Sequence, residues 1–142
     1  MFPQTVVGIK DSSGDANNLQ AILDRFFPFG TFAGSEKFLL QTLRHGGAGT
    51  ITAMANIIPA QIRRLYDNWQ SPEADQIQAE LNVLRDVLRA YPTIPALKQI
   101  VAHLRQDPAW AICRPPLVNL SHAQAEELLA KLPLSEMLVA AA

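Results

Sequence analysis

The chain has 142 residues, enough for one domain with one core, and its 12 Lys and Arg against 13 Asp and Glu give a formal net charge of -1. No long run of like charge is present, so the sequence predicts neither nucleic acid nor an anionic membrane as a partner. The only cysteine, Cys113, excludes an internal disulfide, and the three scattered histidines lack a metal-ligand spacing, so no metal is predicted.

No basic and then apolar leader pattern opens the sequence, and no apolar stretch approaches the roughly 18 residues of a membrane span. Together with the single cysteine, this predicts a soluble cytoplasmic protein.

The first sixty residues alternate between strand-like and helix-like segments. Strands are predicted at residues 6–10, 31–34 and 48–55. One helix follows the N-cap candidate Asp15, a second covers residues 36–45, and a third starts near Pro59 behind the cap candidate Asn56. This alternation is typical of βα units that build a parallel sheet.

From Ser71 onward no strand-like run remains, and three helices are predicted. The first follows Ser71-Pro72-Glu73 and ends at Tyr91-Pro92, and the second runs from about residue 95 to 105. The third opens with the capping box Ser121-His122-Ala123-Gln124 and reaches Leu132, and the apolar tail after it is expected to dock or to fray.

Lys10 is the first candidate functional residue, because it ends an apolar strand and opens the polar turn at residues 11–15. An unperturbed lysine has a pKa of about 10.4, and apolar surroundings can lower that pKa by up to about 3 units or more. A neutral amine can attack a carbonyl group and form a Schiff base. The alternative is a solvated lysine that begins a loop.

Four segments, in this order, resemble the dihydrodipicolinate synthase and N-acetylneuraminate lyase family. They are Val-Val-Gly-Ile-Lys-Asp-Ser-Ser-Gly-Asp at 6–15, Ala-Gly-Ser-Glu at 33–36, Gly-Gly-Ala-Gly-Thr-Ile-Thr-Ala-Met-Ala-Asn at 46–56 and Arg-Pro-Pro-Leu at 114–117. The resemblance implies an α/β fold: about three βα units from the C-terminal part of a (β/α)8 TIM barrel, followed by a three-helix segment. Residues 1–70 would form the partial barrel and residues 71–142 the helical segment.

The resemblance also implies a site. Lys10 would form a Schiff base with pyruvate or another 2-oxo acid, without a metal or an organic cofactor. Gly34 and Ile51 would line the pocket through their main chain, and Ser35 and Glu36 would meet the second substrate. Glu36 has an alternative interpretation, as a first-turn carboxylate favoured by the helix dipole.

The implied activity is that of a class I carbon-carbon lyase or synthase. An aldolase acting on a 2-keto-3-deoxy acid or another 2-oxo acid is preferred to a 4-hydroxy-tetrahydrodipicolinate synthase-like enzyme. The reason is that Ala-Gly-Ser-Glu at 33–36 replaces the acidic pair associated with the lysine-pathway synthases.

Two further segments of the family's apparatus do not occur in this sequence: a Tyr-Asn-x-Pro type segment for proton transfer and a Gly-Thr/Ser-Thr-Gly-Glu type segment for the substrate carboxylate. The lysine strand and the last strand would then be unpaired edges. The alternative to an enzyme is therefore a noncatalytic truncated fragment or interaction module that needs an N-terminal half for activity. A split gene product, assembly with that half and a retained module all remain open, and a homo-oligomer is also expected.

Overall fold

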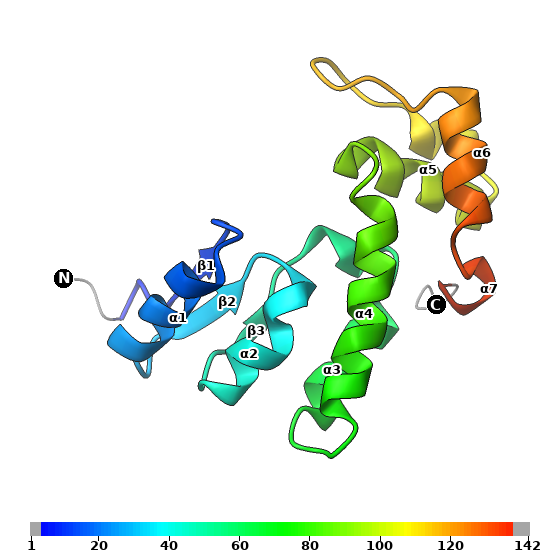
Figure 1. Ribbon diagram of the computed structural model, residues 1–142. Coiled ribbons are helices and arrows are strands. Elements are labelled where there is room, and N and C mark those ends of the chain that lie inside the picture. Colours follow the sequence, from blue (N-terminus) through cyan, green and yellow to red (C-terminus); the bar gives the residue numbers. More distant parts are fainter. Residues whose placement is uncertain (1–3, 138–142) are drawn as a thin grey trace. The chain divides into compact units, whose positions relative to one another are not determined.

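The computed structural model describes residues 4–137, and it is an α/β structure with three strands followed by helices (Figure 1). The strands are β1 (Gly8–Asp11), β2 (Gly30–Ala33) and β3 (Gly49–Thr50). The helices are α1 (Ala16–Arg25), α2 (Leu39–Arg44), α3 (Pro59–Asn68), α4 (Ala74–Leu88), α5 (Thr93–Arg105), α6 (His122–Ala130) and α7 (Leu134–Met137). Short 3-10 helices are η1 (Glu36–Phe38), η2 (Ala53–Asn56) and η3 (Pro108–Ala111).

Two compact units make up the chain. The first unit contains the described residues up to Thr52 together with Gln61–Leu81, and the second contains Ala53–Ala60 and the described residues from Asn82 onward. The domain division expected at residue 70 stays a prediction.

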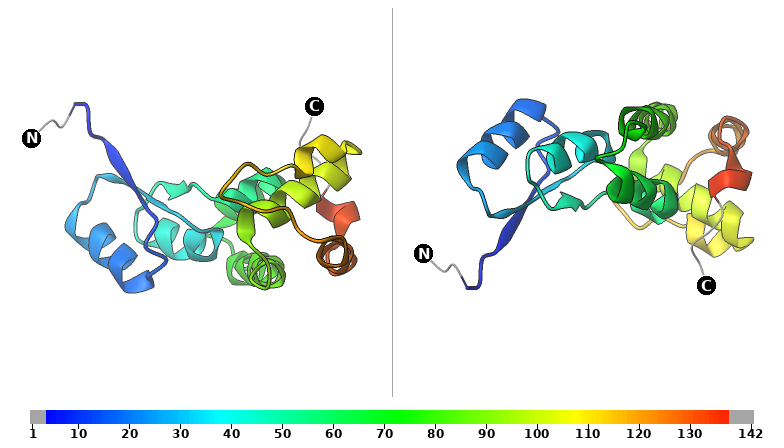
Figure 2. Two further views of the ribbon diagram at one scale, coloured as in Figure 1. Left: turned by 90° about the horizontal axis from the view of Figure 1, so that it is seen from above. Right: turned by 90° about the horizontal axis from the view of Figure 1, so that it is seen from below.

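The three strands of the first unit pair in parallel in the order β1-β2-β3, which makes β1 and β3 the edges of this sheet. Helices α1 and α2 both contact β2 and lie on the same side of the sheet, as right-handed crossovers require (Figure 2). The predicted βα alternation is thereby confirmed. The predicted third strand is too long, because the chain after Thr50 turns into η2 instead of continuing in the sheet.

The core of the first unit lies between the sheet and its helices. Leu19 and Leu23 of α1 pack with Ala33 of β2, and Phe38 covers them. Helix α1 begins where predicted, since the Asp15 carboxylate accepts a hydrogen bond of 2.8 Å from the Asn17 amide. Asn56 does not cap α3: its side chain donates to the carbonyl of Ala53.

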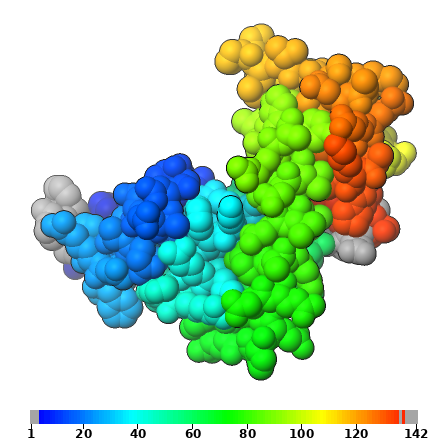
Figure 3. Space-filling view, viewed as in Figure 1, coloured from blue at the N-terminus to red at the C-terminus, as the bar shows by residue number. Residues whose placement is uncertain are grey.

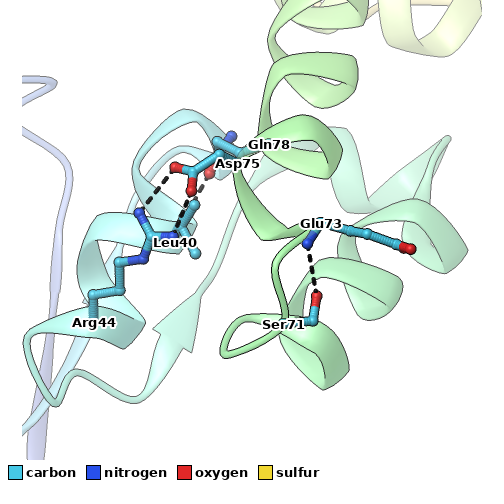
Figure 4. A network of polar contacts seen from close by, with 6 residues as sticks. All are labelled: Leu40, Arg44, Ser71, Glu73, Asp75 and Gln78. Carbon is cyan, nitrogen blue, oxygen red and sulfur yellow. Dashed lines mark hydrogen bonds and ion pairs between the residues drawn. The ribbon is translucent and has the colours of Figure 1, made fainter.

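The first two turns of α4 are fastened to α2 by polar contacts within the first unit (Figure 4). The Arg44 guanidinium donates to both carboxylate oxygens of Asp75, at 2.9 and 2.7 Å. One turn further along α4, the buried Gln78 side chain accepts from the Leu40 amide at 3.0 Å. Helix α4 starts later than predicted, and the Ser71 hydroxyl accepts from the Glu73 amide in the turn that precedes the helix.

The second unit contains α5, η3, α6 and α7. The capping box of α6 is confirmed, because the Ser121 hydroxyl accepts from the Gln124 amide and the Gln124 side chain accepts from the Ser121 amide. The short helix η3 was not predicted; the Asp107 carboxylate caps it by accepting from the Ala109 amide at 2.9 Å. The loop at residues 112–120 projects from α5 and α6 (Figure 3). The predicted apolar tail after Met137 lies outside the described residues.

Among residues 4–137, no helix combines the length and the apolar character that crossing a membrane requires.

The assignment of the core of the first unit can be tested by replacing one of its buried residues. Leu19 is 1% exposed, so Leu19→Ala should lower the free energy of unfolding by about 2–5 kcal/mol, through lost burial and a residual cavity. The control Val7→Ala shortens a side chain that is 68% exposed, and we expect a change within about 0.5 kcal/mol. Urea unfolding followed by circular dichroism measures both, and equal effects would contradict this assignment of the core.

The contact between α2 and α4 predicts a pH dependence. The hydrogen bonds from Arg44 hold the pKa of Asp75 below its ordinary value. A lowered pKa in the folded state adds stability above the unfolded pKa of about 3.9, and this stability is lost as the pH falls through the lower folded pKa.

Asp75→Asn should therefore be less stable than the unchanged chain at pH 6, and the difference should shrink below about pH 4. Urea midpoints across that range measure the difference. A gap that stays constant down to the most acid pH at which the chain folds would contradict the role of the charge.

Candidate functional site

Lys10 lies on the face of the sheet that is turned away from α1 and α2. It pairs with Phe32 of β2, and Phe32 pairs with Gly49 of β3, so the three residues form one row. Thr31 and Ala33, which flank Phe32 in the sequence, are buried on the opposite face, with exposed fractions of 1% and 0%. Alternation along β2 therefore places Lys10 and Phe32 on the face opposite α1 and α2, where the Tyr66 ring of α3 lies against Gly49 at the far end of the row.

The expectation of a buried lysine strand is wrong for the described residues. Lys10 is exposed, and the exposed fractions of Val6, Val7 and Ile9 are 56%, 68% and 43%. The strand begins at Gly8 instead of at residue 6, so Val6 and Val7 precede it, and β1 is an edge strand with a neighbour on one side only. The apolar wall proposed around the Lys10 amine is thus not formed by residues 4–137.

The turn after Lys10 is ordered by the side chain of Asp11. Its carboxylate accepts from the Ser13 amide at 2.9 Å, from the Ser13 hydroxyl at 3.0 Å and from the Asn18 side chain at 3.2 Å. Gly14 completes the turn with a φ of 71°, in the left-handed region that favours glycine. Sequence reasoning missed Asn18, although its place in the first turn of α1 puts it close to this loop.

Gly34 directly follows β2 and lies close to the end of β1. A Cβ atom at this position would sit 2.5 Å from the Asp11 carbonyl oxygen and 3.0 Å from the Ser12 Cα. Only glycine permits that approach without a shift of the main chain. The next residue, Ser35, accepts a hydrogen bond from the Lys37 amide at 3.3 Å and so caps η1.

Glu36 is fully buried in the first turn of η1. Its carboxylate accepts a hydrogen bond of 2.5 Å from the Thr52 hydroxyl, and its main-chain carbonyl accepts one of 3.1 Å from the Gln78 side chain. Sequence reasoning missed Thr52 and Gln78. They lie 16 and 42 residues from Glu36, and no local spacing signals such contacts.

The main chain at Ile51 is tied to the end of β2. Its amide donates to the Ala33 carbonyl at 2.9 Å, and the Thr50 hydroxyl donates to the same oxygen at 2.9 Å. The Ile51 side chain itself is half exposed. The carboxyl ends of all three strands therefore lie at one edge of the sheet, where they bring together Lys10, the loop at residues 34–36 and Ile51.

Known proteins are similar to this chain over part of their own length. The model of the dihydrodipicolinate synthetase family matches residues 2–134. An "Uncharacterized DapA-like lyase" from Chloroflexus aurantiacus is 33% identical over 122 residues, which are 85% of this chain and 40% of the relative. A 4-hydroxy-tetrahydrodipicolinate synthase from Methanoculleus marisnigri is 29% identical, across 87% of this chain and 43% of the relative. The chain thus spans less than half the length of these relatives.

Solved structures show the same partial match. The dihydrodipicolinate synthase from Agrobacterium tumefaciens has a TM-score of 0.76 and 29% identity, over 92% of this chain and 43% of that protein. The N-acetylneuraminate lyase from Fusobacterium nucleatum is similar in fold, with a TM-score of 0.75 over 90% of this chain and 44% of that protein, at 24% identity.

These matches confirm the predicted fold, part of a TIM barrel. Because the family model matches nearly the whole sequence, the chain belongs to the dihydrodipicolinate synthetase family.

Proposed function

We propose that the chain supplies the Schiff-base lysine of a class I carbon-carbon lyase or synthase, and that Lys10 is its nucleophile. The observation that carries this proposal is the position of Lys10: near the carboxyl end of a parallel strand, on the sheet face turned away from α1 and α2. In a closed (β/α)8 barrel this face lines the interior, and catalytic groups lie at the carboxyl ends of the strands.

The chemistry follows from the amine. Lys10 Nζ attacks the carbonyl carbon of a 2-oxo acid, a C–N bond forms, and the carbonyl oxygen leaves as water. The protonated imine draws electrons from the adjacent carbon, which loses a proton and becomes an enamine. The enamine carbon then adds to an aldehyde, and in the reverse direction the same C–C bond breaks. No step of this sequence needs a metal or an organic cofactor.

The substrate class is a 2-oxo acid such as pyruvate. We place the main chain of Gly34 and of Ile51 beside its pyruvate-derived atoms, and Ser35 and Glu36 toward the second substrate. The contacts at the strand ends support this set, because they hold the residues at the same edge as Lys10. Relatives include a "Probable 4-hydroxy-2-oxoglutarate aldolase, mitochondrial" from Emericella nidulans as well as the synthases. Between these two activities we favour an aldolase, because of Ala-Gly-Ser-Glu at 33–36.

We further propose that activity needs the strands that correspond to the unmatched part of the relatives, supplied by a complementing N-terminal half. The edges β1 and β3 and the exposed Val6 and Val7 favour such a partner, or another copy of the chain. The same edges favour the second candidate function, a noncatalytic interaction module. The free thiol of Cys113 supports a reducing compartment such as the cytoplasm.

Borohydride trapping with pyruvate, followed by peptide mapping, tests the nucleophile. The chain is combined with the part of the Chloroflexus aurantiacus relative that it does not match, and it is also treated alone. We expect the adduct on Lys10 of the assembled protein and little label on the chain alone, because general acid–base help alone is worth about 10²–10⁴ in rate.

Two controls accompany this measurement. Lys10→Arg keeps the charge but should abolish the adduct, and Lys98→Arg should leave it unchanged. Label on Lys37, Lys98 or Lys131 in preference to Lys10 would contradict the assignment. An assembled protein in which no lysine is labelled would favour the noncatalytic module.

A further inference from the structure

Two contacts from distant parts of the sequence hold the loop at residues 34–36. Glu36 is 0% exposed and lies between two partners from distant parts of the first unit. On one side the Thr52 hydroxyl donates to its carboxylate at 2.5 Å. On the other side the Gln78 side chain donates to its main-chain carbonyl at 3.1 Å.

Thr52 connects Glu36 to the end of β3. It directly follows Ile51, whose amide donates to the carbonyl of Ala33 at 2.9 Å. The segment at 51–52 is thus held in two places: by the Ala33 carbonyl at the end of β2 and by the Glu36 carboxylate in η1. Glu36 is fully buried, so water competes little for its contact with Thr52.

Gln78 connects Glu36 to α4. Its amide group bridges the start of the helical segment after β2. It donates to the Glu36 carbonyl, and it accepts from the Leu40 amide at 3.0 Å, the contact drawn in Figure 4. The side chain is only 8% exposed, so water competes little for either bond. Asp75, three residues earlier on the same face of α4, adds the ion pair with Arg44.

We propose that Thr52 and Gln78 are positioning residues, which act through Glu36 to hold the Gly34–Glu36 loop and the Ile51 main chain in place at the site. This inference rests on the proposed function for its catalytic consequence. Its structural part, that Thr52 and Gln78 restrain the two segments, stands on the hydrogen bonds alone.

Amide hydrogen exchange in the 142-residue chain tests the structural part. Thr52→Val removes the hydroxyl but keeps the shape, and we expect exchange at the Ile51 amide to rise about tenfold, the effect of losing one good hydrogen bond. Thr52→Ser keeps the hydroxyl and should restore the original rate to within about twofold.

The matched control is Thr42→Val. It removes a buried hydroxyl of α2 that donates to the carbonyl of Phe38, the last residue of η1, at 2.7 Å, and it should leave the Ile51 rate nearly unchanged. Equal effects of Thr52→Val and Thr42→Val at Ile51 would overturn the proposal. Gln78→Met, of similar length but without the amide, is the second variant. It should raise exchange at the Leu40 amide and at Ile51, and an unchanged Ile51 rate would overturn the role of Gln78.

Pyruvate trapping at Lys10 in the assembled protein tests the catalytic consequence. For Thr52→Val we expect the pyruvate concentration for half-maximal trapping to rise about tenfold, with the maximal extent unchanged and with recovery in Thr52→Ser. A residue with a purely structural role, as expected for Thr42, would lower the stability of the protein when replaced. It would not raise the half-maximal pyruvate concentration while leaving the maximal extent of trapping unchanged. If the unchanged protein shows no adduct at Lys10, the proposed function fails, and the exchange rates still decide whether Thr52 and Gln78 restrain the loop.

Discussion

The close approach of Gly34 to the main chain of Asp11 is the contact on which the arrangement of the strand ends depends. No side chain fits between the two strands at this point, since a Cβ on Gly34 would fall 2.5 Å from the Asp11 carbonyl oxygen. The approach lies directly beyond the register that pairs Lys10 with Phe32 and Asp11 with Ala33. It therefore sets how near the lysine strand comes to the loop that carries Ser35 and Glu36.

Hydrogen bonds connect the end of β2 and the segment after it to other parts of the first unit. The Ala33 carbonyl accepts hydrogen bonds from the Ile51 amide and from the Thr50 hydroxyl, and these two bonds hold the end of β3 against β2. Glu36 and Gln78 extend the connection to α4. The buried Gln78 makes two such bonds at once, and burial of a polar side chain is tolerated where its hydrogen bonds are satisfied in this way.

Local patterns of the sequence predicted the local features well. The N-cap at Asp15 and the capping box at Ser121 were found, because a cap is decided by residues within one turn of the helix. Parallel βα units followed from the alternation of segments and are confirmed by the order β1-β2-β3.

The features that were not predicted depend on contacts between residues distant in sequence, or on whether a strand is paired on one side or on both. Apolar composition suggested a buried strand around Lys10, yet Ile9 is 43% exposed, because β1 is an edge strand. The residues after Thr50 have a strand-like sequence, but in the structure the chain forms η2 from Ala53. Thr52 and Gln78 carry no motif, and only the folded arrangement brings them to Glu36. Of the candidate site, the sequence indicated the positions at the strand ends but not the contacts that hold them.

The most direct test of this account is amide hydrogen exchange in Gly34→Ala. The added methyl group must displace the end of β1 from β2, so the amides of Gly8–Asp11 and of Ile51 should lose protection by about tenfold or more. The amides of α5, in the second unit, should keep their rates. A Gly34→Ala variant that keeps full protection at Gly8–Asp11 and at Ile51 would contradict the central claim, that the approach of Gly34 to Asp11 determines the arrangement of the strand ends.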